Sequence, residues 1–229
     1  MIQNLFPLRE EEIFKTLREL KNYDFVVIGG YAVNAYTLPR FSVDCDIVIS
    51  DENELKKIEK TLQKISYTKK HPPTGVLYSG SFSRHEKELD HHFIVSMDIL
   101  IGKVLDRITG SVFTADWVFK HSRMRVLKGK TITEALKLRI IHLDALLVMK
   151  IISCRPTDIR DVFMMLPYAK DEKWIKNEVS LQYNLKDRIA KIQEKVSSKS
   201  FKDGLAGVYG YFDPQTFEKH KKAVMGFLG

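Results

Sequence analysis

The first half of the chain alternates between two patterns of apolar residues. In one pattern they recur every three or four residues, as Leu8, Ile13, Leu17 and Leu20 do, which predicts amphipathic helices. The other pattern is a short apolar run rich in β-formers, which predicts buried strands. Helices are expected over 8–23, 31–38 and 51–65, and strands over 24–29, 42–50, 76–82 and 91–102.

The second half reads differently. The region 104–132 mixes short strands and turns, and from about His142 onward the pattern is helical. This order predicts an α+β fold, with a mixed β-sheet core flanked by helices and then a C-terminal helical region. We expect a core domain over 1–130 and a helical domain over 131–229. Helices are expected over 143–153, 156–169, 172–182, 186–198 and 214–228.

An acidic pair interrupts the apolar run over 42–50. Residues two apart on a strand share a face, so Asp44 and Asp46 point together and Cys45 points the other way into packing. Two neighbouring carboxylates repel each other and are costly to bury. The face is therefore either exposed to solvent or neutralised by cations, and Mg²⁺ or Mn²⁺ suits oxygen ligands of this kind.

A glycine pair precedes the acidic strand. Gly29 and Gly30 close one strand and open a helix, where a backbone without side chains lets a ligand approach closely. The free N–H groups of a helix start favour phosphate. Arg40 follows, and two roles are open for it: contact with a nucleotide phosphate, or an ion pair with an aspartate that holds its loop.

Net charge and cysteine content give limited information about the partner and the compartment of the protein. The 229 residues carry a formal net charge of +8, which is compatible with a polyanionic partner or with a lysine-rich solubilising surface. Two cysteines make no disulfide framework, the start of the chain lacks the pattern of a signal peptide, and no apolar run is long enough to span a bilayer. We therefore expect a cytoplasmic protein with no membrane partner.

The pattern G-G-Y-A followed by R-F-S-V-D-C-D resembles the DNA polymerase β-like nucleotidyltransferase superfamily, and within it most closely the AbiEii-type toxin nucleotidyltransferases and their relatives. The resemblance implies a nucleotidyltransferase core with two Mg²⁺ (or Mn²⁺) ions held by Asp44 and Asp46. It implies a nucleotide site that includes Gly29, Gly30, Tyr31, Arg40 and Ser42. Ser42 stands where threonine is common, and Tyr31 where a small polar residue is usual.

The resemblance also implies a third catalytic carboxylate on a neighbouring strand. Asp98 is the best candidate, because it lies in the middle of an apolar run and a charge there needs a partner or a metal. Asp90 is the alternative, in the polar stretch before that strand. His91 and His92 are expected at the surface, since adjacent residues of a strand point to opposite faces.

A second resembling segment covers 137–166. Family members of this shape imply that Lys150 contacts nucleotide phosphates and that a downstream aspartate supports the site. Asp158 and Asp161 are both candidates because they share a helix face, and Asp161 is included in the predicted nucleotide site. The alternative is an ordinary ion-pair network among these residues and the nearby arginines.

The predicted reaction is transfer of a nucleoside monophosphate from an NTP to an acceptor hydroxyl. The resemblance allows tRNA or other RNA, a protein or a small molecule as acceptor, and the basic charge favours RNA. It also allows a toxin whose partner is an antitoxin protein. The rival hypothesis is a non-catalytic nucleotide- or RNA-binding protein on the same fold.

Overall fold

The computed structural model describes residues 5–70 and 82–227, which form two compact units. Unit 1 comprises 1–35, 41–104 and 113–141, and unit 2 comprises 36–40, 105–112 and 142–229. Both units are therefore discontinuous in sequence. The predicted division into domains over 1–130 and 131–229, with a role for each, stays a prediction.

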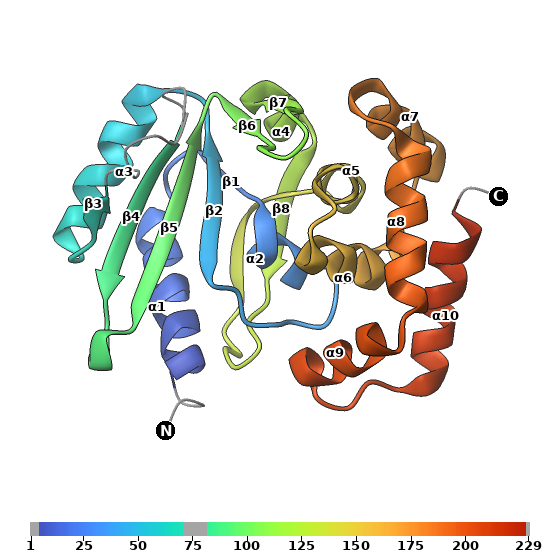
Figure 1. The fold of residues 1–229 in the computed structure, drawn as a ribbon. Coiled ribbons are helices and arrows are strands. Elements are labelled where there is room, and N and C mark those ends of the chain that lie inside the picture. Colours follow the sequence, from blue (N-terminus) through green and yellow to red (C-terminus); the bar gives the residue numbers. More distant parts are fainter. Residues whose placement is uncertain (1–4, 71–81, 228–229) are drawn as a thin grey trace. The chain divides into compact units, whose positions relative to one another are not determined.

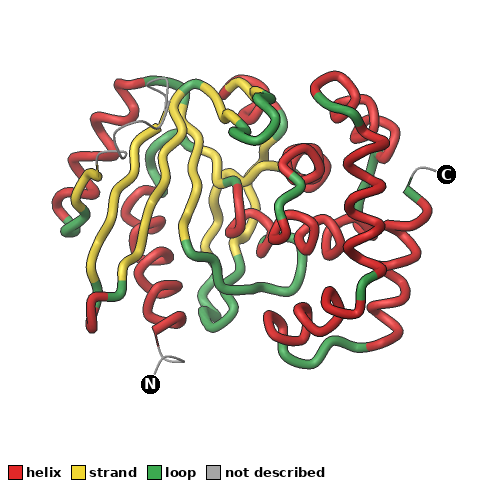
Figure 2. The backbone as a smooth tube through the Cα atoms, viewed as in Figure 1, coloured by secondary structure: helices red, strands yellow, loops and turns green. Residues whose placement is uncertain are grey.

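Unit 1 is built on a seven-stranded mixed sheet (Figure 2). The strands are β1 (Val26–Val27), β2 (Asp44–Ile49), β3 (Thr68–Lys70), β4 (Phe82–Glu88), β5 (Ile94–Ile101), β8 (Ser122–Leu127) and β9 (Leu136–Ile141). They lie in the order β3-β4-β5-β2-β1-β9-β8. The pairs β2–β5 and β1–β9 are parallel, and the other neighbours are antiparallel. This order places the acidic strand β2 beside β5, far from it in sequence.

Helices of unit 1 cover the sheet and connect its strands (Figure 1). They are α1 (Leu5–Leu20), α2 (Gly29–Asn34), α3 (Glu52–Lys64), α4 (Ala115–Lys120) and the short η2 (Asp90–His92). The carboxylate of Asp51 caps α3 by accepting from two backbone N–H groups. Ser83 on β4 donates to Glu59 on α3, so α3 covers the face that carries Ser83 and, through the strand register, Cys45. The predicted aspartates lie on the opposite face.

Unit 2 is mostly helical. Its helices are α5 (Leu143–Ser153), α6 (Pro156–Met165), η3 (Leu166–Tyr168), α7 (Glu172–Gln182), α8 (Leu185–Ser197), α9 (Lys199–Tyr209) and α10 (Pro214–Gly226). Phe163 on α6 lies at its centre, fully buried against Phe201, Phe217 and His220. A separate two-stranded sheet pairs β6 (Lys103–Leu105) with β7 (Val112–Thr114).

The predicted α+β class is confirmed, with a mixed sheet flanked by helices and a helical C-terminal region. The short strands β6, β7 and β8 fall in the region 104–132, where short strands and turns were expected, whereas β4, β9 and the helices α4 and α9 were not foreseen. Most of the strand expected over 76–82 lies outside the described residues. Across the two stretches that the structure does describe, helices fall short of the length and apolarity that crossing a membrane demands.

Glu10 ties α1 to the loop between β8 and β9. Its carboxylate is 1% exposed and accepts from the backbone N–H of Lys130 and Thr131, each at 2.7 Å, and from the Thr131 hydroxyl at 2.6 Å. A Cβ at Gly129 would lie 3.1 Å from the Glu10 carboxylate carbon, so the loop follows the glutamate closely. The position of Lys130 thus depends on Glu10.

We expect Glu10→Ala to lower the free energy of unfolding by about 2–4 kcal/mol, because two backbone N–H groups lose a buried acceptor. Urea unfolding followed by circular dichroism measures the change. Glu11→Ala, on the exposed side of the same helix, is the matched control and should stay within about 0.5 kcal/mol of wild type. Equal losses in the two variants would contradict this account of the loop.

Candidate functional site

The glycine turn lies against the acidic strand. Gly29 begins α2 with a φ of +63°, a conformation that favours glycine. A Cβ at this position would lie 1.9 Å from Oδ2 of Asp46. Gly29 is therefore required both by its backbone and by the carboxylate beside it. Gly30 follows and is buried.

Three carboxylates converge on one face of the sheet. Asp44 and Asp46 extend from β2 and Asp98 from β5, and Asp46 and Asp98 are partners in the parallel register. One ligand oxygen from each of the three lies within 4.8 Å of the others. Oxygens bound to one Mg²⁺ at about 2.1 Å lie at most about 4.2 Å apart, so small side-chain rotations would let the set hold a divalent cation. Cys45, between the two aspartates, is fully buried as predicted.

Arg84 is a member of this site that sequence reasoning missed. It is the register partner of Asp98 on β4 and donates two hydrogen bonds to it, from Nε at 2.8 Å and from Nη2 at 2.6 Å. The same Nη2 lies 3.9 Å from Oδ2 of Asp44. Burial raises the pKa of Asp98, and the bonds from Arg84 oppose that rise. A cation that binds Asp98 has to compete with this guanidinium.

Asp90, the alternative third carboxylate, lies outside the group. It sits in η2 and is exposed, and the metal-competent group found among the described residues contains Asp98 in its place. His92, expected at the surface, is exposed and pairs with Glu88. Of the two candidates, only Asp98 is placed to act with Asp44 and Asp46.

The side chains of Tyr31 and Ser42 are buried. Tyr31 is 1% exposed and meets Phe14 edge to face, with ring centroids 6.4 Å apart. Burial raises the pKa of its phenol well above the ordinary value. Ser42 is 8% exposed, just before β2. The structure therefore gives the Tyr31 ring a place in the core, and a contact between Tyr31 and a nucleotide would have to come from its backbone.

Arg40, Lys150 and Asp161 come together within unit 2. Arg40 donates to both oxygens of Asp161, at 3.0 and 2.8 Å, and Lys150 lies 3.0 Å from Asp161 and 2.7 Å from Asp158. Burial opposes ionisation of Asp161, but Lys150 and Arg40 hold its pKa below the ordinary value. The ion-pair alternatives stated for Arg40 and for Lys150 are thus the arrangements observed. The predicted site residues form two groups, one in each unit.

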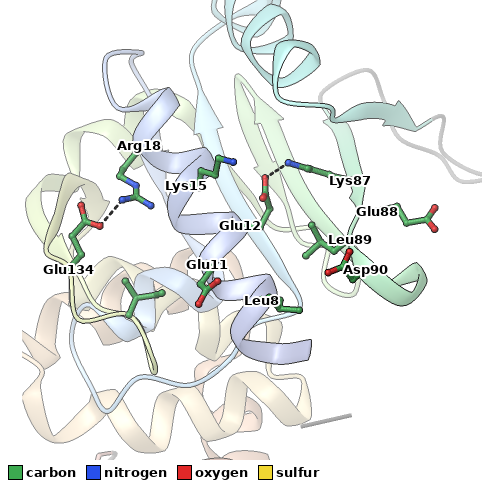
Figure 3. A pocket seen from close by; sticks show the side chains of 11 residues that line it. Leu8, Glu11, Glu12, Lys15, Arg18, Lys87, Glu88, Leu89, Asp90 and Glu134 are labelled. Atoms are coloured by element: carbon green, nitrogen blue, oxygen red, sulfur yellow. Dashed lines mark hydrogen bonds and ion pairs between the residues drawn. The ribbon is translucent and has the colours of Figure 1, made fainter. Parts of the chain in front are cut away.

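A large cavity lies elsewhere in unit 1, beside α1 (Figure 3). Its volume is about 810 Å³, and apart from Asp90, the alternative third carboxylate, none of the predicted site residues is among the described residues that line it. Its ionisable lining consists of Glu11, Glu12, Glu88, Asp90 and Glu134 against Lys15, Arg18 and Lys87. Two of its three cations are in ion pairs, Arg18 with Glu134 and Lys87 with Glu12. This acidic excess does not suit a phosphate-rich ligand.

No protein-family model matches the chain, and no curated protein matches it either. Two solved structures with similar backbones are each named a "putative nucleotidyltransferase". The one from H. pylori is 16% identical over 96% of this chain and 93% of its own, with a TM-score of 0.49. The one from Thermotoga maritima is 19% identical over 61% of this chain and 80% of its own, with a TM-score of 0.41. Similarity of this degree assigns neither a family nor an activity.

The network in unit 2 leads to a prediction about stability. Asp161→Ala should lower the free energy of unfolding by about 3–5 kcal/mol, because it leaves Arg40 and Lys150 buried without their shared partner. Denaturant unfolding measures the loss. Asp203→Ala removes an exposed aspartate on α9 and should change stability by no more than about 0.5 kcal/mol. A small effect of Asp161→Ala would show that water reaches and solvates the network.

A second prediction concerns Arg84. Replacing it with methionine removes a positive charge next to two of the three carboxylates, so Mn²⁺ should bind about tenfold more tightly. Isothermal titration calorimetry with Mn²⁺ alone measures the affinity, and Arg123→Met, at an exposed position of β8, is the matched control. Unchanged affinity in Arg84→Met, or no Mn²⁺ binding by any of these proteins, would contradict the assignment of a cation to this site.

Proposed function

We propose that the chain is a metal-dependent nucleotidyltransferase that moves a nucleoside monophosphate from an NTP to an acceptor hydroxyl. The observation that carries the proposal is the convergence of Asp44, Asp46 and Asp98, brought together by the register of β2 and β5. The resemblance of the glycine turn and acidic strand to the polymerase β-like superfamily supports it. AbiEii-type relatives remain the group to which that pattern is most similar.

In this reaction the acceptor oxygen bonds to the α-phosphorus, and the bond from that phosphorus to the bridging oxygen breaks. Pyrophosphate leaves with the electron pair, and the hydroxyl proton passes to a base. We assign that base to Asp98, because its raised pKa favours proton uptake. Arg84 fixes the orientation of the Asp98 carboxylate through two hydrogen bonds.

Asp44, Asp46 and Asp98 would hold two Mg²⁺ or Mn²⁺ ions. When bound, such ions screen the charge of the triphosphate and lower the pKa of the acceptor hydroxyl. Gly29 and Gly30 leave the backbone open to the phosphates, and we include Tyr31 and Ser42 through their main chain. The three carboxylates alone repel one another, so their arrangement on one face favours cation binding.

From unit 2 we assign Lys150 and Arg40 to the phosphates of the nucleotide, with Asp161 as the residue that positions both. Each cation is already paired with an aspartate. Phosphate oxygens would therefore have to replace a carboxylate partner of either cation. This exchange is easier at Lys150, whose side chain is 13% exposed, than at Arg40, whose side chain is 7% exposed. Lys150 is the stronger candidate for direct contact.

The acceptor we propose is RNA, including tRNA, because a net charge of +8 favours a polyanion. The resemblance leaves a protein hydroxyl or a small molecule as alternatives. It also suggests a toxin held in check by an antitoxin protein. Growth arrest on expression that needs Asp44 and is relieved by a neighbouring gene product would support that role.

The second candidate function is a non-catalytic nucleotide- or RNA-binding protein. One observation favours it: Arg84 occupies both oxygens of Asp98, as a cation would in a catalytic site. Such a protein would bind an ATP analogue and release no pyrophosphate from ATP.

The test is transfer from each of the four α-³²P-labelled NTPs to total RNA in the presence of Mg²⁺. We expect Asp44→Ala to lose about 100-fold or more of the labelling, because a residue that would hold the metal ions contributes several kcal/mol to stabilising the transition state. Asp203→Ala is the matched charge control and should label at the wild-type rate. EDTA should abolish labelling, and Mn²⁺ should restore it.

Equal labelling by wild type and Asp44→Ala would overturn the proposed function. Nucleotide binding without pyrophosphate release by the wild type would establish the non-catalytic alternative.

A further inference from the structure

Three phenylalanines form a cluster at one edge of unit 1. Phe6 stacks on Phe41 with ring centroids 5.6 Å apart and planes 24° apart, and it meets Phe93 edge to face at 6.2 Å. The three rings come from α1, from the segment before β2 and from the segment before β5. We call this group the aromatic cluster.

Two cations lie over the same rings. The guanidinium carbon of Arg9 is 4.2 Å from the ring centroid of Phe93 and 5.9 Å from that of Phe6. The ammonium of Lys130 is 5.1 Å from the ring centroid of Phe41. Each ring of the aromatic cluster therefore has a positive charge within cation–π distance. Glu10 holds the loop that carries Lys130, and Arg9 also donates to the backbone carbonyl of Ile94.

The aromatic cluster is partly open to solvent, unlike the core. Phe6 is 40% exposed, and Val43 and Ile94, which follow Phe41 and Phe93 closely in the sequence, are 67% and 47% exposed. Phe14, two turns further along α1, is 2% exposed. Packing of α1 on the sheet thus accounts for Phe14 but leaves the stack of Phe6 on Phe41 with an accessible side.

The aromatic cluster lies at the end of the sheet where β2 and β5 begin. Phe41 precedes Asp44 by three residues, and because β2 and β5 are parallel with Asp44 opposite Ser96, Phe93 reaches the same end of the sheet. The first turn of α1 also lies at this end (Figure 1). Asp44 is close enough to Arg9 to act on its charge. Three residues of extended chain span about 10 Å, roughly the length of one or two nucleotides.

Aromatic rings interleaved with cations recognise unpaired nucleotides, whose bases stack on the rings while the phosphates meet the positive charges. We propose that the aromatic cluster, with Arg9 and Lys130, binds a single-stranded segment of the acceptor RNA next to the three carboxylates. That the bound RNA is the acceptor rests on the proposed function, whereas RNA binding itself rests on the aromatic cluster. Three rings and two cations over four segments exceed what the single base of an NTP needs.

The test separates stacking from apolar packing at Phe6. Phe6→Leu keeps apolar bulk but has no π face, whereas Phe6→Tyr keeps the ring. Fluorescence anisotropy with a labelled eight-nucleotide single-stranded RNA at low salt should show binding weakened about 5- to 100-fold in Phe6→Leu. Binding by Phe6→Tyr should stay within about twofold of wild type, since its ring still stacks. Leu181→Ala, at an exposed apolar position in unit 2, is the control and should bind like wild type.

A second variant guards against misfolding of the first. Lys130→Gln should lower the slope of log affinity against log salt by about one, the loss of one phosphate contact. Thermal unfolding of each variant confirms that it is folded. In transfer assays Phe6→Leu should raise KM for RNA and leave KM for the NTP unchanged.

The inference is overturned if wild type fails to bind the single-stranded RNA, if Phe6→Leu binds it as tightly as wild type, or if Phe6→Leu raises KM for the NTP instead. RNA binding that depends on Phe6, in a wild type that transfers nothing, would support the aromatic cluster and count against the proposed function. Transfer to RNA at the same rate and KM in Phe6→Leu and wild type would support the proposed function and count against the aromatic cluster.

Discussion

Repulsion between three carboxylates is the constraint around which unit 1 is organised. Asp46 and Asp98 are opposite each other because β2 and β5 pair in parallel register, and Asp44 lies two residues before Asp46 on the same face. Such a group stays ionised only beside positive charge. The sheet supplies some of it from the next strand, since Arg84 on β4 is the register partner of Asp98. The strand order β4-β5-β2 is therefore also the layout of the candidate site.

In unit 2 a carboxylate is also neutralised by neighbouring cations, but with less access to solvent. Asp161 has no exposed surface and is shared by Arg40 and Lys150, whose side chains are 7% and 13% exposed. Arg84, which holds Asp98, is 39% exposed. Water and ligands reach an exposed guanidinium more easily, so exchanging its partner costs less than exchanging that of a buried one. We therefore regard Arg84 as the adjustable member of the two networks and Asp161 as the fixed one.

The sequence predicted β2 and its site because carboxylates stand out inside an apolar run, and Asp98 was found in β5 for the same reason. Arg84 was missed because β4 carries polar residues on both faces, including the buried Ser83 and His85, and has no apolar alternation. The helix α9 was missed because it contains Gly204 and Gly207, which disfavour helices. Its buried Phe201 and Leu205, one turn apart, hold it in place. The sequence pattern predicts an element when its apolar residues are the buried ones. The elements β4 and α9 depend on tertiary contacts instead.

The charges along α1 separate two surfaces that a polyanion would treat differently. Arg9 lies at the aromatic cluster, whereas Glu11 and Glu12, one turn further, line the large cavity with its acidic excess. The cavity would repel phosphates, and the cations at the aromatic cluster would attract them. At ordinary salt each of these effects acts over about 10 Å. A volume of about 810 Å³ makes the cavity the more obvious binding site by shape. For a nucleic acid, charge outweighs shape, so the proposed RNA contact lies at the aromatic cluster and not in the cavity.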